Sequence, residues 1–287
     1  MNTKNQKIID WLLENKNPAV KYRTQTEILG EPGDKASIIE YLNKSLPADW
    51  REREGLWSTY YLTAVAECGL TAEDFPINKE KAVDFGEKYQ FGHSCGDYMR
   101  LRALIRLGFE NDPKIAEIIR NLPSKQLPDG GFLCLHRIDK LKRTPKSCVK
   151  ANMHALMFCA ECRKKGIETE IEAPLINYFR NHNIFYRTDD LDALMLQARE
   201  GWRTIDTFHP FEVMRVGLHN VVEAFCALGY ANDPMLREAW TLLNAKSTPN
   251  GTIMDQTSTK PYLPKERAGK PGKWVTFYTL LAEKEKL

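Results

Sequence analysis

The sequence lacks a long apolar run, and this excludes an ordinary membrane-spanning helix. Its longest tidy apolar segment covers only residues 155–160, whereas crossing a bilayer takes about 20 residues. The N-terminal segment MNTKNQKIIDWLLENKN is polar and contains no apolar signal region. We therefore expect a cytoplasmic protein without a transmembrane segment.

A strong charge of one sign is also missing. The 41 Lys and Arg residues and the 38 Asp and Glu residues leave a formal net charge of only +3, which is too balanced to predict a nucleic-acid partner. The seven cysteines are odd in number, so we interpret them as reduced, mostly buried thiols. Hydrophobic residues make up 43% of the chain, which excludes a long disordered protein.

Strand-like alternation of apolar and polar residues is scarce, whereas helical spacing and an internal repeat are clear. The segments that begin at Ala103 and at Ala224 align without a gap. In both copies a leucine–glycine–aromatic triplet closes one helix, Asn-Asp-Pro opens the next, and a Pro/Gly turn follows. The repeated unit is therefore a helix, a tight turn, a second helix and a glycine turn.

Weaker copies of this unit fill the rest of the chain and divide the helices into two sets. One set is apolar on all sides, as buried helices are, and the other is shorter and amphipathic. Their alternation predicts an all-α fold, a closed α/α toroid (α6/α6 barrel) that forms a single domain over residues 1–287. An open solenoid of stacked helical pairs is the alternative. The predicted inner helices cover residues 18–30, 57–69, 94–108, 147–163, 211–229 and 272–284, and the outer ones cover residues 4–14, 35–46, 79–89, 113–125, 170–182 and 234–246.

One copy of the glycine turn resembles a known repeat. The segment Gln126-Leu-Pro-Asp-Gly-Gly-Phe132 is similar to the glycine-rich repeat of protein prenyltransferase β subunits and squalene (terpenoid) cyclases. The second copy, residues 247–253, is degraded. The resemblance implies an α/α toroid with a central apolar cavity and a lipophilic, isoprenoid-like small molecule as its substrate.

The same resemblance implies an anion site for a diphosphate. Prenyltransferases place a His before one inner helix and two basic residues before a zinc-binding Cys. His93, Lys140 and Arg143 stand in matching positions, and Lys146 adds a further positive charge. Lys146 also occupies the position where the zinc motif would need an Asp, so we expect no metal site and no cofactor. The cyclase acid motif Asp-x-Asp-Asp is not found in the sequence.

Two further groups of residues permit a metal interpretation. The acidic loop 189–192 could hold Mg²⁺ beside a diphosphate, and a solvated surface loop is the alternative. Cys148, His154, Cys159 and Cys162 could hold zinc, but packing within a helix explains them without a metal.

Three residues are candidate catalytic groups. Asp97 is an acid in a predicted buried helix, where an apolar setting raises a carboxyl pKa; a first-turn charge that stabilises the helix N-terminus is the alternative. Cys148 is expected at the start of an inner helix, where nearby lysines favour the thiolate, and simple burial is the alternative. His154 is the one nearby base, six positions further on.

Several ring-bearing residues are candidates for substrate binding. Aromatic rings at the starts of inner helices either line a cavity, where they stabilise cations, or pack in the core. The spacing of His219 and Glu223 would also allow them simply to pair with each other. The expected substrate-binding set is Trp57, Tyr61, Tyr98, Phe211, His219 and Trp274.

These patterns together predict an enzyme that acts on an isoprenoid or another lipophilic small molecule in a central aromatic cavity. A non-catalytic binder of a hydrophobic ligand or partner peptide on the same toroid is the second interpretation, which the missing zinc and acid motifs favour. A purely structural helical scaffold with a filled centre is the third.

Overall fold

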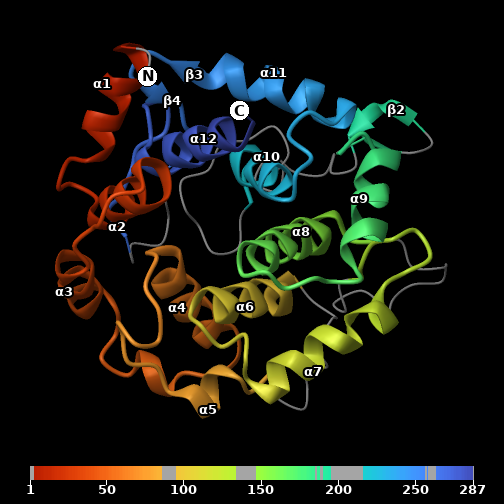
Figure 1. Ribbon diagram of the computed structural model, residues 1–287, viewed down its shortest axis with the longest axis horizontal. Coiled ribbons are helices and arrows are strands. Elements are labelled where there is room, and N and C mark those ends of the chain that lie inside the picture. The colour runs from red at the N-terminus through yellow and green to blue at the C-terminus, as the bar shows by residue number, and fades with distance from the viewer. Residues whose placement is uncertain are drawn as a thin grey trace.

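The computed structural model describes residues 3–85, 95–133, 147–184, 186–187, 190–194, 216–255, 257 and 263–286. Within these ranges the helices form two concentric rings (Figure 1). The even-numbered helices form the inner ring and the odd-numbered helices the outer ring. The inner ring comprises α2(Pro18–Arg23), which continues as a π-helical segment Thr24–Leu29, α4(Gly55–Glu67), α6(Cys95–Arg106), α8(Val149–Lys164), α10(Leu218–Ala227) and α12(Lys273–Lys286); the outer ring comprises α1(Thr3–Leu12), α3(Ala36–Ser45), α5(Lys79–Ala82), α7(Pro113–Asn121), α9(Glu172–Asn181) and α11(Arg237–Lys246).

The inner ring is closed. Successive inner helices pack against each other from α4 to α12, and α12 packs against α2. The ring is completed between α2 and α4, where Arg23 and Glu67 form a buried ion pair of 3.0 Å. The predicted all-α toroid is therefore confirmed, and the open solenoid is wrong.

Burial follows the two sets that the sequence distinguishes. In α8 every residue from Val149 to Cys162 is buried except Lys150, whereas α7 buries only Ile115. A helix surrounded by other helices needs apolar or internally paired side chains on every face, and a helix of the outer ring needs them on one face only. No described helix is long and apolar enough to cross a membrane.

The turn chemistry of the repeat is also confirmed. Gly108 and Gly229 have φ values of 92° and 87°, a conformation that is costly for any residue with a Cβ. The side chains of Asp112 and Asp233 accept hydrogen bonds from the backbone N–H groups two residues on, and so cap the helical segments that follow. In both copies these local features end an inner helix and start the helical segment that leads into the outer ring.

The glycine turn around Gly130 has a structural role. A Cβ at Gly130, where φ is 86°, would lie 2.2 Å from the backbone oxygen of Pro174. The Asp129 carboxylate accepts hydrogen bonds from the N–H of Gly131 (3.0 Å) and the hydroxyl of Ser147 (2.5 Å). The Gln126 amide donates to the oxygen of Gly130 at 2.7 Å. The motif thus ties its own turn to the starts of α8 and α9.

Two small antiparallel hairpins were not expected from the sequence. They pair β1(Tyr186–Arg187) with β2(Asp190–Leu194) and β3(Ser247–Thr248) with β4(Gly251–Thr252). The expectation of a loop at residues 189–192 is wrong for its strand residues, because β2 begins at Asp190. Strands this short need only backbone pairing and a tight turn; in the second hairpin the turn covers residues 249–250, and Gly251 follows it with φ of 115°.

Candidate functional site

The C-terminal halves of the inner helices meet in a largely buried cluster of charged side chains, here the ionic cluster, in which only Glu27 and Lys164 are about one-third exposed. Arg106 and Glu67, which end α6 and α4, lie 3.7 Å apart, so these helices run in the same direction and end together. Each inner helix from α2 to α10 contributes a charge to the cluster. Its cations are Arg23, Arg102, Arg106 and Lys164, and its anions are Glu27, Glu67, Glu161 and Glu223.

Arg23 is the best-connected member of the ionic cluster and is only 1% exposed. Its guanidinium donates to both carboxylate oxygens of Glu27 (2.5 and 2.8 Å), to Glu67 (3.0 Å) and to the hydroxyl of Tyr278 (3.0 Å). The same group lies 4.6 Å from the centroid of the Phe277 ring. Burial alone would lower the pKa of Arg23, but the Glu27 and Glu67 carboxylates raise it, so the side chain stays charged.

The two arginines of α6 link Glu67 to Glu161. Arg102 lies 3.3 Å from Glu67 and 3.4 Å from Glu161, and Arg106 lies 3.0 Å from Glu161. Burial alone would raise the pKa of Glu161, but Arg106, Lys164 and Arg102 hold it well below its usual range. These charges neutralise one another, so the cluster is a paired ionic core.

His219 and Glu223 do not pair as their spacing suggested. The Glu223 carboxylate instead accepts a hydrogen bond of 2.6 Å from Lys164 on α8. His219 is buried, with its ring centroid 5.9 Å from that of Tyr278. Trp274 is also buried and stacks on Tyr278 at 6.3 Å. Both predicted substrate-binding residues therefore lie against the aromatic surroundings of the ionic cluster.

The start of α4 carries exposed apolar surface at the opposite, N-terminal end of the inner ring. Trp57 is 51% exposed and its neighbour Leu56 is 45% exposed. The rings of Tyr60 and Tyr61 lie 5.7 and 6.3 Å from the Trp57 ring, edge-on and stacked respectively. We refer to Trp57, Tyr60 and Tyr61 as the aromatic rim. The structure thus brings together two of the predicted substrate-binding residues, Trp57 and Tyr61.

Tyr98 takes a different position from these rings. It is fully buried in the first half of α6, and its ring lies 4.9 Å from that of Phe132. Burial raises the pKa of Tyr98 well above its usual value. Asp97, the residue before it, is buried in the first turn of the same helix.

The other two catalytic candidates lie on α8. Cys148 is the half-buried residue that precedes the helix. His154 is buried, and burial, with Lys150 and Arg102 nearby, lowers its pKa to about 3. His154 is therefore a neutral imidazole at physiological pH and a weak base.

The predicted anion site cannot be assembled from the described residues. His93, Lys140, Arg143, Lys146 and Phe211 all lie outside the described ranges, as does Asp189 of the acidic loop. In the part of the chain that is described, no group of three or more His, Cys, Asp or Glu residues is arranged to hold a metal ion. Burial raises the pKa of the Cys159 thiol to about 12 and also raises that of Cys162, so both thiols are protonated.

Glu266, seven residues before the start of α12, is a buried carboxyl that the sequence analysis missed. Its Oε1 accepts a hydrogen bond of 2.5 Å from the N–H of Lys273, and its Oε2 is buried with no hydrogen-bond partner among the described residues. Burial raises the pKa of Glu266 to about 7, despite the backbone N–H groups of Lys273 and Trp274. The residue stands in a loop, where helical periodicity gives no signal.

Replacing Glu266 by Gln should change how stability depends on pH. A carboxyl whose pKa rises from 4.5 to about 7 on folding stabilises the fold fully below pH 4.5, and this contribution is lost as the pH rises through 7. The difference in unfolding free energy between Glu266→Gln and wild type should therefore shift by up to about 3 kcal/mol between pH 5 and 8. Urea titrations at several pH values measure it, with the exposed Glu285→Gln as control. Equal slopes for wild type and Glu266→Gln would show that Glu266 titrates normally.

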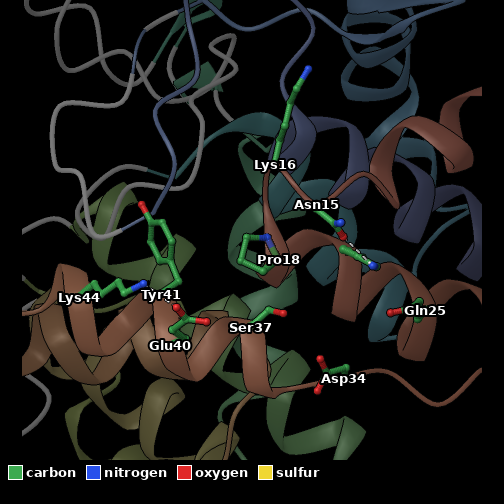
Figure 2. A pocket seen from close by; sticks show the side chains of 10 residues that line it. Asn15, Lys16, Pro18, Gln25, Asp34, Ser37, Glu40, Tyr41 and Lys44 are labelled. Carbon is green, nitrogen blue, oxygen red and sulfur yellow. Dashed lines mark hydrogen bonds and ion pairs between the residues drawn. The ribbon is translucent and has the colours of Figure 1, made fainter.

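A polar groove is a second feature that the sequence analysis missed. It has a volume of about 390 Å³ and lies between α2 and α3. Figure 2 shows Gln25 on one wall and Ser37, Glu40 and Tyr41 on the other. The α3 residues recur at helical spacing, so they share one face of that helix.

Comparisons with known proteins give a fold relationship. No family model and no curated protein matches the chain. Among solved structures, the glycosyl hydrolase family 88 protein from Bacteroides vulgatus is similar over 99% of both chains, with a TM-score of 0.52 and 14% sequence identity. This similarity supports the α/α toroid.

The resemblance to prenyltransferases and terpenoid cyclases is wrong, and so is the isoprenoid function drawn from it. The structural relative is a glycosyl hydrolase family protein and not a member of either group. The physical reason lies in the motif itself. A glycine is needed at position 130 because the backbone of Pro174 approaches it closely, and the Asp129 carboxylate accepts hydrogen bonds from the N–H of Gly131 and the Ser147 hydroxyl. Both residues are therefore required by the structure of the turn between two helices, and the motif carries no information about the substrate.

Proposed function

We propose that the chain is a carbohydrate-active enzyme that cleaves a glycosidic bond in a saccharide bound at the N-terminal ends of the inner helices. The observation that carries the proposal is Trp57, a large ring half exposed at the start of α4 and flanked by Tyr60 and Tyr61. An exposed apolar surface of this kind is typical of a ligand-binding site.

The chemistry of a sugar ring fits such a surface. The hydroxyl groups of a pyranose point outward around its edge, and its C–H bonds form an apolar face that can stack on a flat aromatic ring. Trp offers the largest such ring and has few rotatable bonds to immobilise on binding. The two tyrosines behind Trp57 are buried and hold its position.

The position of the ionic cluster favours the N-terminal ends of the inner helices as the place where a ligand binds. Its carboxylates and cations are paired with one another at the other end, and separating them to bind a ligand would leave buried charges uncompensated. The relative's description as a glycosyl hydrolase supports a saccharide as the ligand class.

The proposed catalytic pair is Asp97, in the first turn of α6, and Glu266, which accepts a hydrogen bond from the first residue of α12. Glycoside hydrolysis commonly uses one carboxylic acid that protonates the leaving oxygen and one carboxylate that activates water. Glu266, with a pKa of about 7, would donate its proton to the glycosidic oxygen as the bond from that oxygen to the anomeric carbon breaks. Water would then add to that carbon and give its proton to Asp97.

The direct test replaces the exposed ring. Trp57→Ala should weaken saccharide binding about tenfold or more, because it removes the stacking surface. Leu56→Ala is the matched control, since it removes a neighbouring apolar side chain of similar exposure but no ring. Calorimetry with maltohexaose, cellohexaose, chitohexaose and xylohexaose measures both variants. Equal affinities for Trp57→Ala and wild type, or binding of none of the four, would contradict the proposal.

The catalytic role has a separate test. Asp97→Asn should reduce hydrolysis by roughly 100-fold or more while leaving saccharide binding nearly unchanged, because the amide keeps the size of the carboxyl but cannot accept the proton. Release of reducing ends from the same four hexasaccharides measures turnover. Full activity in Asp97→Asn would remove this residue from the mechanism.

A further inference from the structure

No residue of the aromatic rim lines the groove between α2 and α3, and the volume of the groove, about 390 Å³, falls within the range of small-molecule sites, roughly 300–1,000 Å³. It is lined by residues of both helices, and Figure 2 shows Pro18 between them. The groove is formed entirely by described residues, and the proposed mechanism does not use it.

Charges of both signs line the groove, and most already have partners. Lys44 lies 2.5 Å from Glu40, and Lys21 donates to the Asn15 side chain at 2.8 Å. Asp34 accepts a hydrogen bond of 2.9 Å from the backbone of Ala36. An anionic ligand would meet Asp34 and Glu40, and a cationic ligand would meet the lysines, so neither sign is favoured.

The groups left for a ligand are neutral. The uncharged side chains with hydrogen-bonding groups on the two helix walls are Gln25, Ser37 and Tyr41. Gln25 and Ser37 lie on opposite walls and point toward each other, and the Tyr41 ring stands at one end (Figure 2). One amide and two hydroxyls can both donate and accept hydrogen bonds, and the ring adds an apolar face.

We infer that this groove is a second saccharide-binding site, which takes a neutral, polyhydroxylated ligand away from the aromatic rim. Hydroxyl groups of the ligand pair with Gln25, Ser37 and the Tyr41 hydroxyl, and an apolar sugar face packs on the Tyr41 ring. The inference rests on the proposed function for the class of ligand, and it gives the full chain two independent points of contact with one saccharide or with two.

The test is to map binding residue by residue. Amide chemical shifts of the isotope-labelled full chain are followed during titration with maltohexaose, cellohexaose, chitohexaose and xylohexaose. At least one hexasaccharide should shift residues 25–44 and residues 56–61 as two separate sites. Tyr41→Ala and Ser37→Ala should weaken binding in the groove about tenfold and leave the aromatic rim unchanged, whereas Trp57→Ala should do the reverse.

The outcomes separate the two proposals. Shifts at the aromatic rim alone would overturn the second site and leave the proposed function standing. Shifts in the groove that Tyr41→Ala does not weaken, or that the zwitterion glycine produces equally well, would overturn the saccharide assignment of the groove. If none of the four hexasaccharides shifts either region, both proposals fail.

Discussion

Arg23→Met should lower the free energy of unfolding by about 3–5 kcal/mol. The substitution keeps a long, apolar side chain but removes the guanidinium that binds Glu27, Glu67 and Tyr278. Both carboxylates then lose their nearest cation, and the cost falls mainly on Glu67, whose side chain is only 2% exposed, because an uncompensated buried charge is costly. The contact of the guanidinium with the Phe277 ring is lost as well.

The control for this prediction is an ion pair at the surface. Arg163, on the exposed side of α8, pairs with Glu172 at 2.8 Å and is 52% exposed. Arg163→Ala should cost less than about 1 kcal/mol, because water solvates and screens the pair. Urea denaturation of both variants and of wild type provides the comparison. Similar small losses for Arg23→Met and Arg163→Ala would mean that the ionic cluster does not stabilise the closed ring.

Gly130→Ala should destabilise the fold by about 2–5 kcal/mol. The new methyl group would sit at a φ of 86°, which costs an L-residue about 1–2 kcal/mol, and only 2.2 Å from the backbone oxygen of Pro174. A backbone atom at that distance has to move, and such overpacking typically costs a further 1–3 kcal/mol. The shift would separate the glycine turn from the start of α9.

Gly108→Ala separates the cost of the backbone conformation from the cost of the close contact. Gly108 has a φ of 92°, but a Cβ there would meet nothing within 4 Å. Its replacement should therefore cost only the conformational term, about 1–2 kcal/mol. Thermal unfolding of both variants gives the difference, which measures the close approach to Pro174. An equal loss at the two positions would show that the contact relaxes without cost.

The sequence was sufficient for the fold because its signals are local. The end of one helix and the start of the next are specified by the local preferences of Gly108, Asp112 and Pro113. The second copy of the repeat, at Gly229, has the same residue types in the same order. Apolar residues on all sides of α4 and α8 distinguish the inner ring from the outer one. Closure then follows from stacking equivalent units.

The candidate site was less predictable because it depends on contacts between distant residues. Arg23 and Tyr278 are far apart in the sequence, and only the packing of α12 on α2 makes them partners. Trp57 was identified from its place at a helix start and is half exposed, but Tyr61 and Trp274 have the same kind of place and are buried. The exposure of a side chain at a helix start depends on how the neighbouring helices pack, and the spacing of apolar residues in the sequence does not predict it.

The resemblance failed for a related reason. A glycine-rich turn reflects the backbone geometry between two helices, and proteins of the same fold can require the same turn although they catalyse unrelated reactions. Gly130 and Asp129 satisfy the turn and the helix beside it. Substrate class is set by side chains that face the ligand, such as the exposed ring of Trp57.

A crystal structure of the Asp97→Asn variant with its bound hexasaccharide tests the central claim most directly, because this variant should bind without cleaving. The account predicts a sugar ring stacked on the face of Trp57, with the scissile bond between the carboxyl of Glu266 and the side chain at position 97. A saccharide bound among Arg23, Glu67 and their partners at the opposite end of the inner helices would contradict it.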